Sequence, residues 1–165
     1  MGTVSFVAKQ AEMRHLEEAA ALFNEYRMFY GQAPDPGGAR AYVQERLAHG
    51  DSVIFLAMKE ENGVPAEAAG FLQLYPTFSS IAMQRSWILN DLFVRESWRR
   101  RGVAQLLLDK ARLHALATGA KGLELSTAVT NLNAQRLYER NGYVRDEAFH
   151  HYSLTLRDRE REPSS

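Results

Sequence analysis

The spacing of apolar and polar residues changes along the chain, and each spacing indicates a type of element. Residues 3–9 alternate, which predicts a short strand. Residues 13–30 place apolar side chains three and four positions apart, which predicts an amphipathic helix. The run "GQAPDPGG" ends that helix with prolines and glycines, and a second short helix is expected over 39–49.

The middle of the chain reads as a series of strands. Residues 52–59 form an apolar run, the turn "EENGVP" follows, and residues 67–78 are the expected hairpin partner. Residues 86–94, "SWILNDLFV", form a third apolar run that predicts another strand. These three runs should pair in one sheet.

The last part alternates between helical and extended patterns. A helix is predicted over 103–118, a strand over 123–127, and a helix over 133–141 that Gly142 stops. The alternating run "FHHYSLTL", residues 149–156, predicts a final strand. Strands thus follow one another both as hairpins and through helices, which favours a mixed sheet. We expect one domain over 1–157 and a charged tail over 158–165.

The amino-acid composition excludes several classes of function. Lysine plus arginine equals aspartate plus glutamate at 20 each, so a basic surface for nucleic acid or an anionic membrane is not expected. The chain has no cysteine, which excludes disulfides, cysteine-bound zinc and a cysteine nucleophile, and no residue spacing supports a metal site. No run approaches the roughly 20 apolar residues of a membrane span, and the first residues lack a signal pattern. A cytoplasmic protein is expected.

The stretch "WRRRGVAQLL" carries the most specific chemistry. Arg99, Arg100 and Arg101 stand against Gly102 directly before a predicted helix, where like charge would repel the positive end of the helix dipole. An anion in the turn would resolve this, because the first N–H groups of a helix lack partners and a glycine allows close approach. The stretch matches neither GxxxxGK[ST] nor GxGxxG. The alternative is an exposed basic turn without a ligand.

Two motifs together resemble those of the GNAT N-acetyltransferase family. "LFVRESWRRRGVAQLLL" resembles the acetyl-CoA motif [RQ]-x-x-G-x-[GA] of that family, and "NLNAQRLYERNGY" resembles its second motif, N-x-x-A-x-x-x-Y-x-x-x-G-[FY]. The resemblance spans nearly the whole chain in element order and residues 87–143 at the level of motifs. Within the family, "NDLFV" and the second motif are most similar to the branch of spermidine/spermine and yeast-type histone/polyamine acetyltransferases. The matching residues are Arg99, Gly102, Ala104, Asn131, Ala134, Tyr138, Gly142 and Tyr143.

The resemblance implies an α/β GNAT fold, with a mixed, mostly antiparallel twisted sheet of about six or seven strands and about four helices. It implies acetyl-CoA as cofactor and an acyltransferase that acetylates a small amine, a polyamine or a lysine-like amine by direct attack. The pyrophosphate would lie on backbone N–H groups of residues 100–104 and the pantetheine arm along residues 92–94, with the Val94 N–H on the thioester oxygen. The implied cofactor-binding residues are Leu92, Phe93, Val94, Arg99, Arg100, Arg101, Gly102, Val103, Ala104, Gln105, Asn131, Asn133, Ala134 and Tyr138.

Acetyl transfer to an amine needs a base and an acid. A primary amine with a pKa near ~10.4 is mostly protonated at neutral pH, so a base must remove a proton, and the leaving thiolate must be protonated or hydrogen-bonded. The resemblance makes Tyr138 the general acid, and the alternative is a core tyrosine. The identity of the general base stays undecided. The branch has L-E-D-[LF]-[FY]-V where this chain has Asn90, which can orient a water or an amine but cannot be a base. Asp91 is either a base re-aimed by a bulge or a structural carboxylate.

The acceptor pocket is expected at the end of the first long helix and on the last strand. Tyr26, Phe29 and Tyr30 lie in the helix and Tyr152 in the strand, and hydrophobic core is the alternative for the first three. The expected partner is a small-molecule amine or a lysine-containing peptide, and a homodimer is expected through residues 149–156. Two other functions stay open: a peptide or protein lysine or N-terminal acetyltransferase, and a non-catalytic acyl-CoA sensor.

Overall fold

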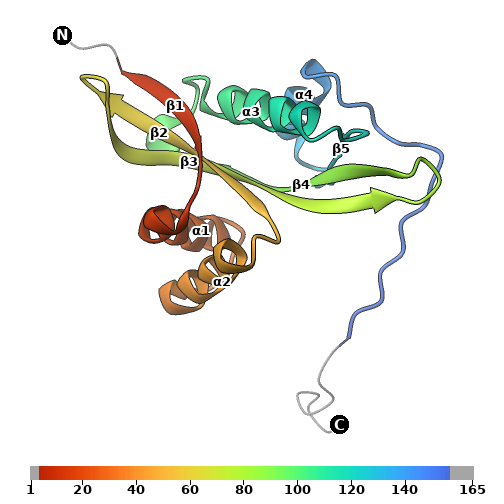
Figure 1. Ribbon diagram of the computed structural model, residues 1–165, viewed down its shortest axis with the longest axis horizontal. Helices are drawn as coiled ribbons and strands as arrows, with labels where there is room; N and C mark the ends of the chain where they lie inside the picture. Colours follow the sequence, from red (N-terminus) through yellow and green to blue (C-terminus); the bar gives the residue numbers. More distant parts are fainter. Residues whose placement is uncertain (1–3, 157–165) are drawn as a thin grey trace, which may run out of the picture. The chain divides into compact units, whose positions relative to one another are not determined.

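A computed structural model of the chain describes residues 4–156 (Figure 1). The chain divides into two units, Met1–Val129 and Thr130–Ser165. The prediction of one domain over 1–157 stays a prediction. The charged tail predicted over 158–165, residue 157 and the predicted start of the first strand at Thr3 lie outside the described residues.

The first unit is built on a mixed sheet. Its strands follow the spatial order β1-β2-β3-β4-β5; the first three pairings are antiparallel and β4 pairs with β5 in parallel. The predicted mixed, mostly antiparallel sheet is therefore confirmed, with five strands over residues 4–156 in place of six or seven. The strands are β1 (Ser5–Gln10), β2 (Val53–Glu61), β3 (Val64–Ser79), β4 (Gln84–Val94) and β5 (Leu123–Glu124).

Helices cover both faces of this sheet, α1 and α2 on one face and α3 on the other (Figure 1). The predicted first helix begins three residues late as an α-helix, because Met13–His15 forms a 3-10 turn. A second 3-10 turn, Glu96–Trp98, follows β4. The four α-helices over residues 4–156, matching the number expected, are α1 (Leu16–Phe29), α2 (Pro36–His49), α3 (Val103–Ala117) and, in the second unit, α4 (Leu132–Arg140).

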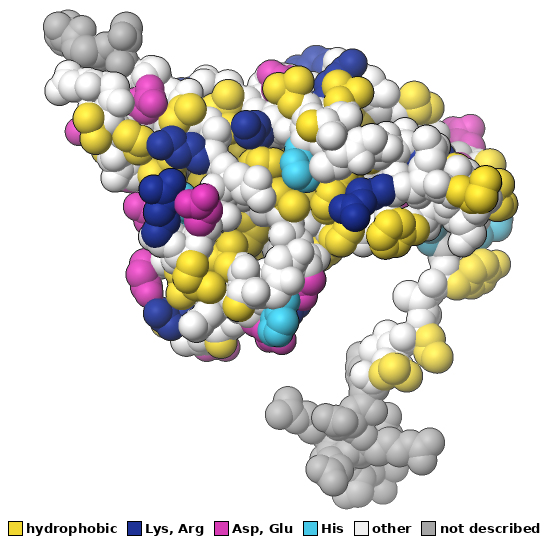
Figure 2. Space-filling view, viewed as in Figure 1, with side chains coloured by type: hydrophobic (Ala, Val, Ile, Leu, Met, Phe, Trp, Pro, Cys, Tyr) yellow, Lys and Arg dark blue, Asp and Glu magenta, His cyan; other side chains and the backbone are white. Residues whose placement is uncertain are grey.

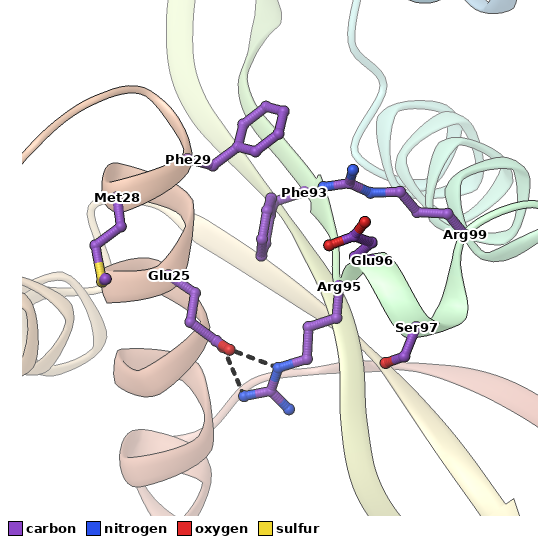
Figure 3. A pocket seen from close by; sticks show the side chains of 8 residues that line it. All are labelled: Glu25, Met28, Phe29, Phe93, Arg95, Glu96, Ser97 and Arg99. Carbon is purple, nitrogen blue, oxygen red and sulfur yellow. Dashed lines mark hydrogen bonds and ion pairs between the residues drawn. The ribbon is translucent and has the colours of Figure 1, made fainter.

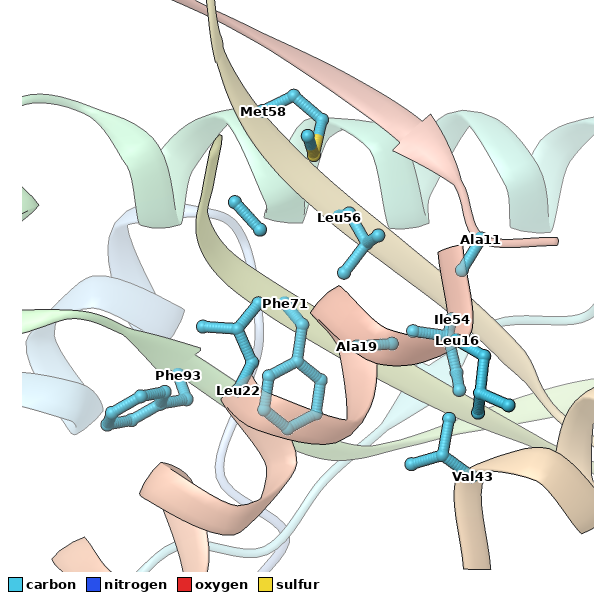
Figure 4. Packing of buried hydrophobic residues seen from close by; sticks show 11 residues of the cluster. Ala11, Leu16, Ala19, Leu22, Val43, Ile54, Leu56, Met58, Phe71 and Phe93 are labelled. Atoms are coloured by element: carbon cyan, nitrogen blue, oxygen red, sulfur yellow. The ribbon is translucent and has the colours of Figure 1, made fainter. Parts of the chain in front are cut away.

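Strand β2 shows why its sequence is continuously apolar. Ile54, Leu56 and Met58 pack in the cluster that α1 and α2 cover (Figure 4). Phe55 points to the opposite face, where its ring lies 5.4 Å from His114 of α3. Since helices cover both faces, residues on both sides of the strand are apolar.

The pairing of β3 with β4 contains a bulge. Gln73 pairs with Asp91 and Leu74 pairs with Leu89, so Asn90 has no opposite residue. A bulge of this kind bends a strand and changes where its side chains point. The bulge lies next to Asp91, the residue whose role as general base or as structural carboxylate the sequence leaves undecided.

The predicted strands at the end of the chain are wrong in extent. β5 has two residues, in place of 123–127, and residues 149–156 form no strand. An alternating pattern makes a segment suitable for a strand, but a strand also needs a hydrogen-bonded neighbour. Within residues 4–156 this segment belongs to no ladder, and its apolar side chains are exposed.

The described part of the chain holds no helix of the length and apolar character that crossing a bilayer requires. On the face that Figure 2 shows, basic and acidic side chains are interspersed and do not gather into one basic surface.

Candidate functional site

The outer edge of β4 is open along its second half. β4 and β5 pair only at Trp87 with Leu123 and at Ile88 with Glu124. Among the described strands, none continues along β4 beyond that point on this side. The Arg95 N–H donates to the Ala69 oxygen across the β3 side, at 2.8 Å. Because successive residues of a strand direct their backbone groups to opposite edges, the N–H of Val94 points to the open edge.

The helix that follows β4 begins without compensation for its dipole. Gly102 is the N-cap residue with φ +78, and the first turn of α3 contains no acidic residue. A Cβ placed on Gly102 would meet nothing within 4 Å, so the space beside the turn is open. Backbone N–H groups, the dipole and the adjacent arginines suit an anion here. The residues present therefore fit a bound pyrophosphate.

The arginines of this turn differ in their surroundings. Arg99 donates from Nε to the Val94 oxygen at 2.9 Å, and its guanidinium lies 4.9 Å from the Phe29 ring centre. Arg101 lies 5.3 Å from the Trp98 ring centre. Arg100 is exposed and has a left-handed φ of 62°. The Arg99 side chain thus contacts both β4 and α1 from the turn. The phosphate contact that the motif implies for Arg99 would be an additional one.

A cavity of about 730 Å³ lies between the end of α1 and this turn (Figure 3). Phe29 and Phe93 form aromatic walls, and the Arg99 guanidinium reaches over them. The Glu25 carboxylate is paired with Arg95, so its charge is compensated. The lining residues are Glu25, Met28, Phe29, Phe93, Arg95, Glu96, Ser97 and Arg99.

The aromatic residues predicted for the acceptor pocket separate into two groups. Tyr26 is partly buried and packs against the core, with its ring centre 5.4 Å from that of Phe71 and 5.9 Å from that of Phe93. Phe29 lines the cavity, and Tyr30 lies beside it with ring centres 5.3 Å apart. Of the three, Phe29 is the one that faces the cavity.

The bulge brings Asn90 and Asp91 together. The Asn90 Nδ2 lies 3.2 and 3.1 Å from the two carboxylate oxygens of Asp91. Asp91 is 6% exposed and also accepts from Gln73 Nε2 at 2.8 Å. The same Nε2 donates to the Tyr75 hydroxyl at 3.1 Å, while the Ser52 hydroxyl donates to Gln73 Oε1 at 2.9 Å. In a regular strand the side chains of Asn90 and Asp91 would point to opposite faces. The bulge interrupts this alternation and lets the two side chains meet.

A tyrosine pair extends this network toward α2. The hydroxyls of Tyr75 and Tyr42 lie 2.7 Å apart, and the Arg46 guanidinium lies 4.9 Å from the Tyr42 ring centre. Burial, the hydrogen bond to Tyr42 and the charge of Asp91 raise the pKa of Tyr75 above its ordinary value. These surroundings favour the neutral phenol of Tyr75 over its phenolate.

In the second unit, α4 begins with a side-chain cap. Asn131 accepts from the Ala134 N–H at 3.2 Å, which explains an asparagine at that position of the motif. Asn133 is exposed, and Tyr138 is half-buried with its ring 5.8 Å from that of Tyr143. Tyr152 is 92% exposed on a segment that forms no strand. The prediction that placed it on a final strand is wrong.

The turn before α3 and the helix α4 both fall inside a known family signature. The sequence model of the acetyltransferase (GNAT) family matches residues 14–143. The chain belongs to the GNAT acetyltransferase family. Acetyl-CoA is accordingly its acetyl donor, and the expected fold, cofactor and enzyme class are confirmed.

Several GNAT proteins are similar to this chain. The uncharacterized N-acetyltransferase YhfO of Bacillus subtilis is 48% identical over 148 residues, which are 90% of this chain and 96% of the relative. An L-ornithine N5-acetyltransferase of Arabidopsis thaliana is 32% identical over 74 residues, which are 45% of this chain and 32% of the relative. The crystal structure of a probable acetyltransferase, 42% identical, superposes with a TM-score of 0.84 and covers 92% of this chain and 98% of the solved chain. None of these names supports the polyamine and histone branch.

The sequence did not single out four residues around Asp91 in this GNAT chain, which are Ser52, Gln73, Tyr75 and Tyr42. One signal was present in the sequence: Gln73 interrupts the apolar run "GFLQLY" of a strand that is otherwise buried. A buried amide requires partners, so its position indicates a polar network.

Proposed function

We propose that the chain transfers an acetyl group from acetyl-CoA to a primary amine of a small molecule. The observation that carries this proposal is the open outer edge of β4, followed after one short turn by the start of α3, which has no side-chain cap. An extended ligand with an anionic end fits an unpaired strand edge followed by a helix N-terminus.

Acetyl-CoA, when bound, supplies the thioester whose acetyl group is transferred. The backbone of Leu92, Phe93 and Val94 would bind its pantetheine arm, with the Val94 N–H donating to the thioester oxygen. Residues from Arg99 to Gln105 would bind the pyrophosphate. Asn131, Asn133 and Ala134 are the residues of α4 that the family motif assigns to the cofactor.

Proton movement would involve residues from both motifs. Tyr138 is proposed to protonate the departing thiolate. Asp91, held by Asn90, is proposed to receive the proton of the amine directly or through water, with Asn90 orienting that water or the amine.

The acceptor is proposed to be a small aliphatic amine. The cavity beside Phe29 has aromatic walls and carries both a carboxylate, from Glu96, and a guanidinium, from Arg99, which suit an alkyl amine that also has a carboxylate. The name of the Arabidopsis relative, an L-ornithine N5-acetyltransferase, supports an amino-acid-like amine. Tyr30 and Tyr152 stay predicted contacts of the acceptor, and a cytoplasmic location and a homodimer stay predictions.

A thiol-release assay with acetyl-CoA tests this function. The panel would contain ornithine, lysine, polyamines, aminoglycosides and a lysine peptide, each at several concentrations. We expect release that requires both acetyl-CoA and one of the small amines, with the acetylated product seen by mass spectrometry. Turnover of the peptide alone would instead indicate a protein acetyltransferase. Binding of acetyl-CoA with no turnover of any amine would indicate a sensor.

A further inference from the structure

We propose that Gln73 is a positioning residue that holds the Asp91 carboxylate to receive the ammonium group of the acceptor amine. The inference rests on the proposed function and adds a residue that neither family motif contains. Gln73 lies on β3, one strand away from the motif residues of β4, and pairs with Asp91 in the sheet.

Hydrogen bonds hold both the nitrogen and the oxygen of the Gln73 side-chain amide. The side chain is 1% exposed, and its Nε2 donates to Asp91 at 2.8 Å and to Tyr75 at 3.1 Å. Its Oε1 accepts from Ser52 at 2.9 Å. An ionised carboxylate can only accept hydrogen bonds, so the nitrogen of the amide must face Asp91. The amide therefore has one orientation, and the carboxylate beside it is held in place.

Asp91 is a buried carboxylate whose hydrogen-bond donors are side-chain amides. Its donors are Gln73 and Asn90, and none of the ion pairs found within residues 4–156 includes it. A carboxylate offers about four acceptor positions, and amide bonds leave its negative charge only partly balanced. A protonated amine supplies both the missing hydrogen bonds and the missing charge.

Asp91 is buried directly beside an exposed residue of β4. It follows the bulged and exposed Asn90, on the part of β4 whose outer edge is open. Asn90 and Gln73 hold the carboxylate from two different strands. Removal of the Gln73 donor would leave Asn90, which lies at the longer distances of 3.1 and 3.2 Å, to orient Asp91 by itself.

The test is Gln73→Met, which keeps the length of the side chain and removes its hydrogen bonds. We expect the KM of the amine identified in the panel to rise about 10-fold or more, since hydrogen bonds to charged groups are stronger than neutral ones. The Kd of acetyl-CoA should stay within about twofold of wild type. The matched control is Tyr75→Phe, which removes the other bond of the same nitrogen and leaves the bond to Asp91.

A double-mutant cycle separates positioning from general loss of packing. The cycle is read as the Kd of the amine, measured by calorimetry with coenzyme A bound, because Asp91→Asn removes the proposed base. In that background, where the charge is absent, Gln73→Met should have little further effect on the amine Kd. An equal effect in both backgrounds, or an equal effect of Tyr75→Phe, would assign Gln73 a structural role and overturn the inference. If Gln73→Met does not fold, Gln73→Leu takes its place in the same cycle.

The two proposals fail in different ways. A wild-type protein that acetylates no amine of the panel contradicts the proposed function. A wild-type protein that acetylates an amine whose KM does not change in Gln73→Met contradicts the role of Gln73 alone.

Discussion

Arg95, the first residue after β4, contacts a single oxygen of Glu25 on α1 through two nitrogens, with Nε at 2.8 Å and Nη2 at 2.7 Å from Oε2 (Figure 3). Its third nitrogen, Nη1, donates to the Ala68 oxygen at 2.7 Å. One guanidinium therefore joins α1, β3 and β4 at the wall of the cavity.

Glu25→Gln should lower the free energy of unfolding by about 1 kcal/mol, because the pair is partly shielded from water and Arg95 would lose its counter-charge. Urea denaturation measures the change. Glu17→Gln, which breaks the more exposed pair of Glu17 with Arg40, is the matched control and should change stability by less than about 0.5 kcal/mol. Equal losses of stability in the two variants would mean that the partly buried pair of Glu25 with Arg95 contributes no more than the exposed pair of Glu17 with Arg40.

Gly102→Val should abolish the rise in melting temperature that acetyl-CoA causes. A β-branched residue at φ +78 is strained, and its side chain would occupy the open space beside the start of α3. Gly119→Val is the control, since Gly119 has φ +66 and equally open space just after the other end of α3. Both variants should be less stable, but only Gly102→Val should lose the response to acetyl-CoA; retained binding would contradict the assignment of the turn.

Tyr138→Phe should lower kcat by about 10- to 10⁴-fold while the Kd of acetyl-CoA stays unchanged, because only the proton donor is removed. The ring remains next to Tyr143, so the melting temperature should move little. Turnover and melting temperature are measured on the same samples, with Tyr143→Phe as control. A loss of stability with normal turnover would make Tyr138 a structural residue.

His114 should make stability depend on pH in the acidic range. Burial, with the charges of Lys110 and Arg85, lowers its pKa below the ordinary 6.5. The unfolded chain then binds a proton that the folded chain does not, so this contribution is complete above pH 6.5 and is lost as the pH falls below it. His114→Phe keeps a ring against Phe55 and Trp87 and should remove this part of the pH dependence of the melting temperature. An unchanged dependence of the melting temperature on pH in His114→Phe would show that His114 is not its source.

Most of the fold was predictable from local patterns. The cores of β2, β3 and β4 follow from apolar runs bounded by turn residues, the core of α3 follows from helical spacing of apolar residues, and Gly102 marked the turn before α3 correctly. The final strand was not predictable in this way, because alternation over residues 149–156 specifies the character of a segment and not its partner.

The candidate site was predictable only where it lies within a continuous motif. The bulge at Asn90 depends on the register between β3 and β4, which no single strand determines. Ser52, Gln73 and Asp91 come from three separate parts of the chain, 21 and 18 positions apart, and meet only when the sheet forms. Sequence patterns thus pointed to Asn90 and Asp91 but not to Gln73 and Ser52.

The open outer edge of β4 also has a consequence for handling the protein. Unpaired N–H and C=O groups on a strand edge are a template for pairing with the strands of other molecules. A ligand that covers this edge would block such pairing. Concentrated preparations should therefore self-associate more in the absence of coenzyme A than in its presence, so that supply of the acetyl donor would govern colloidal stability as well as catalysis.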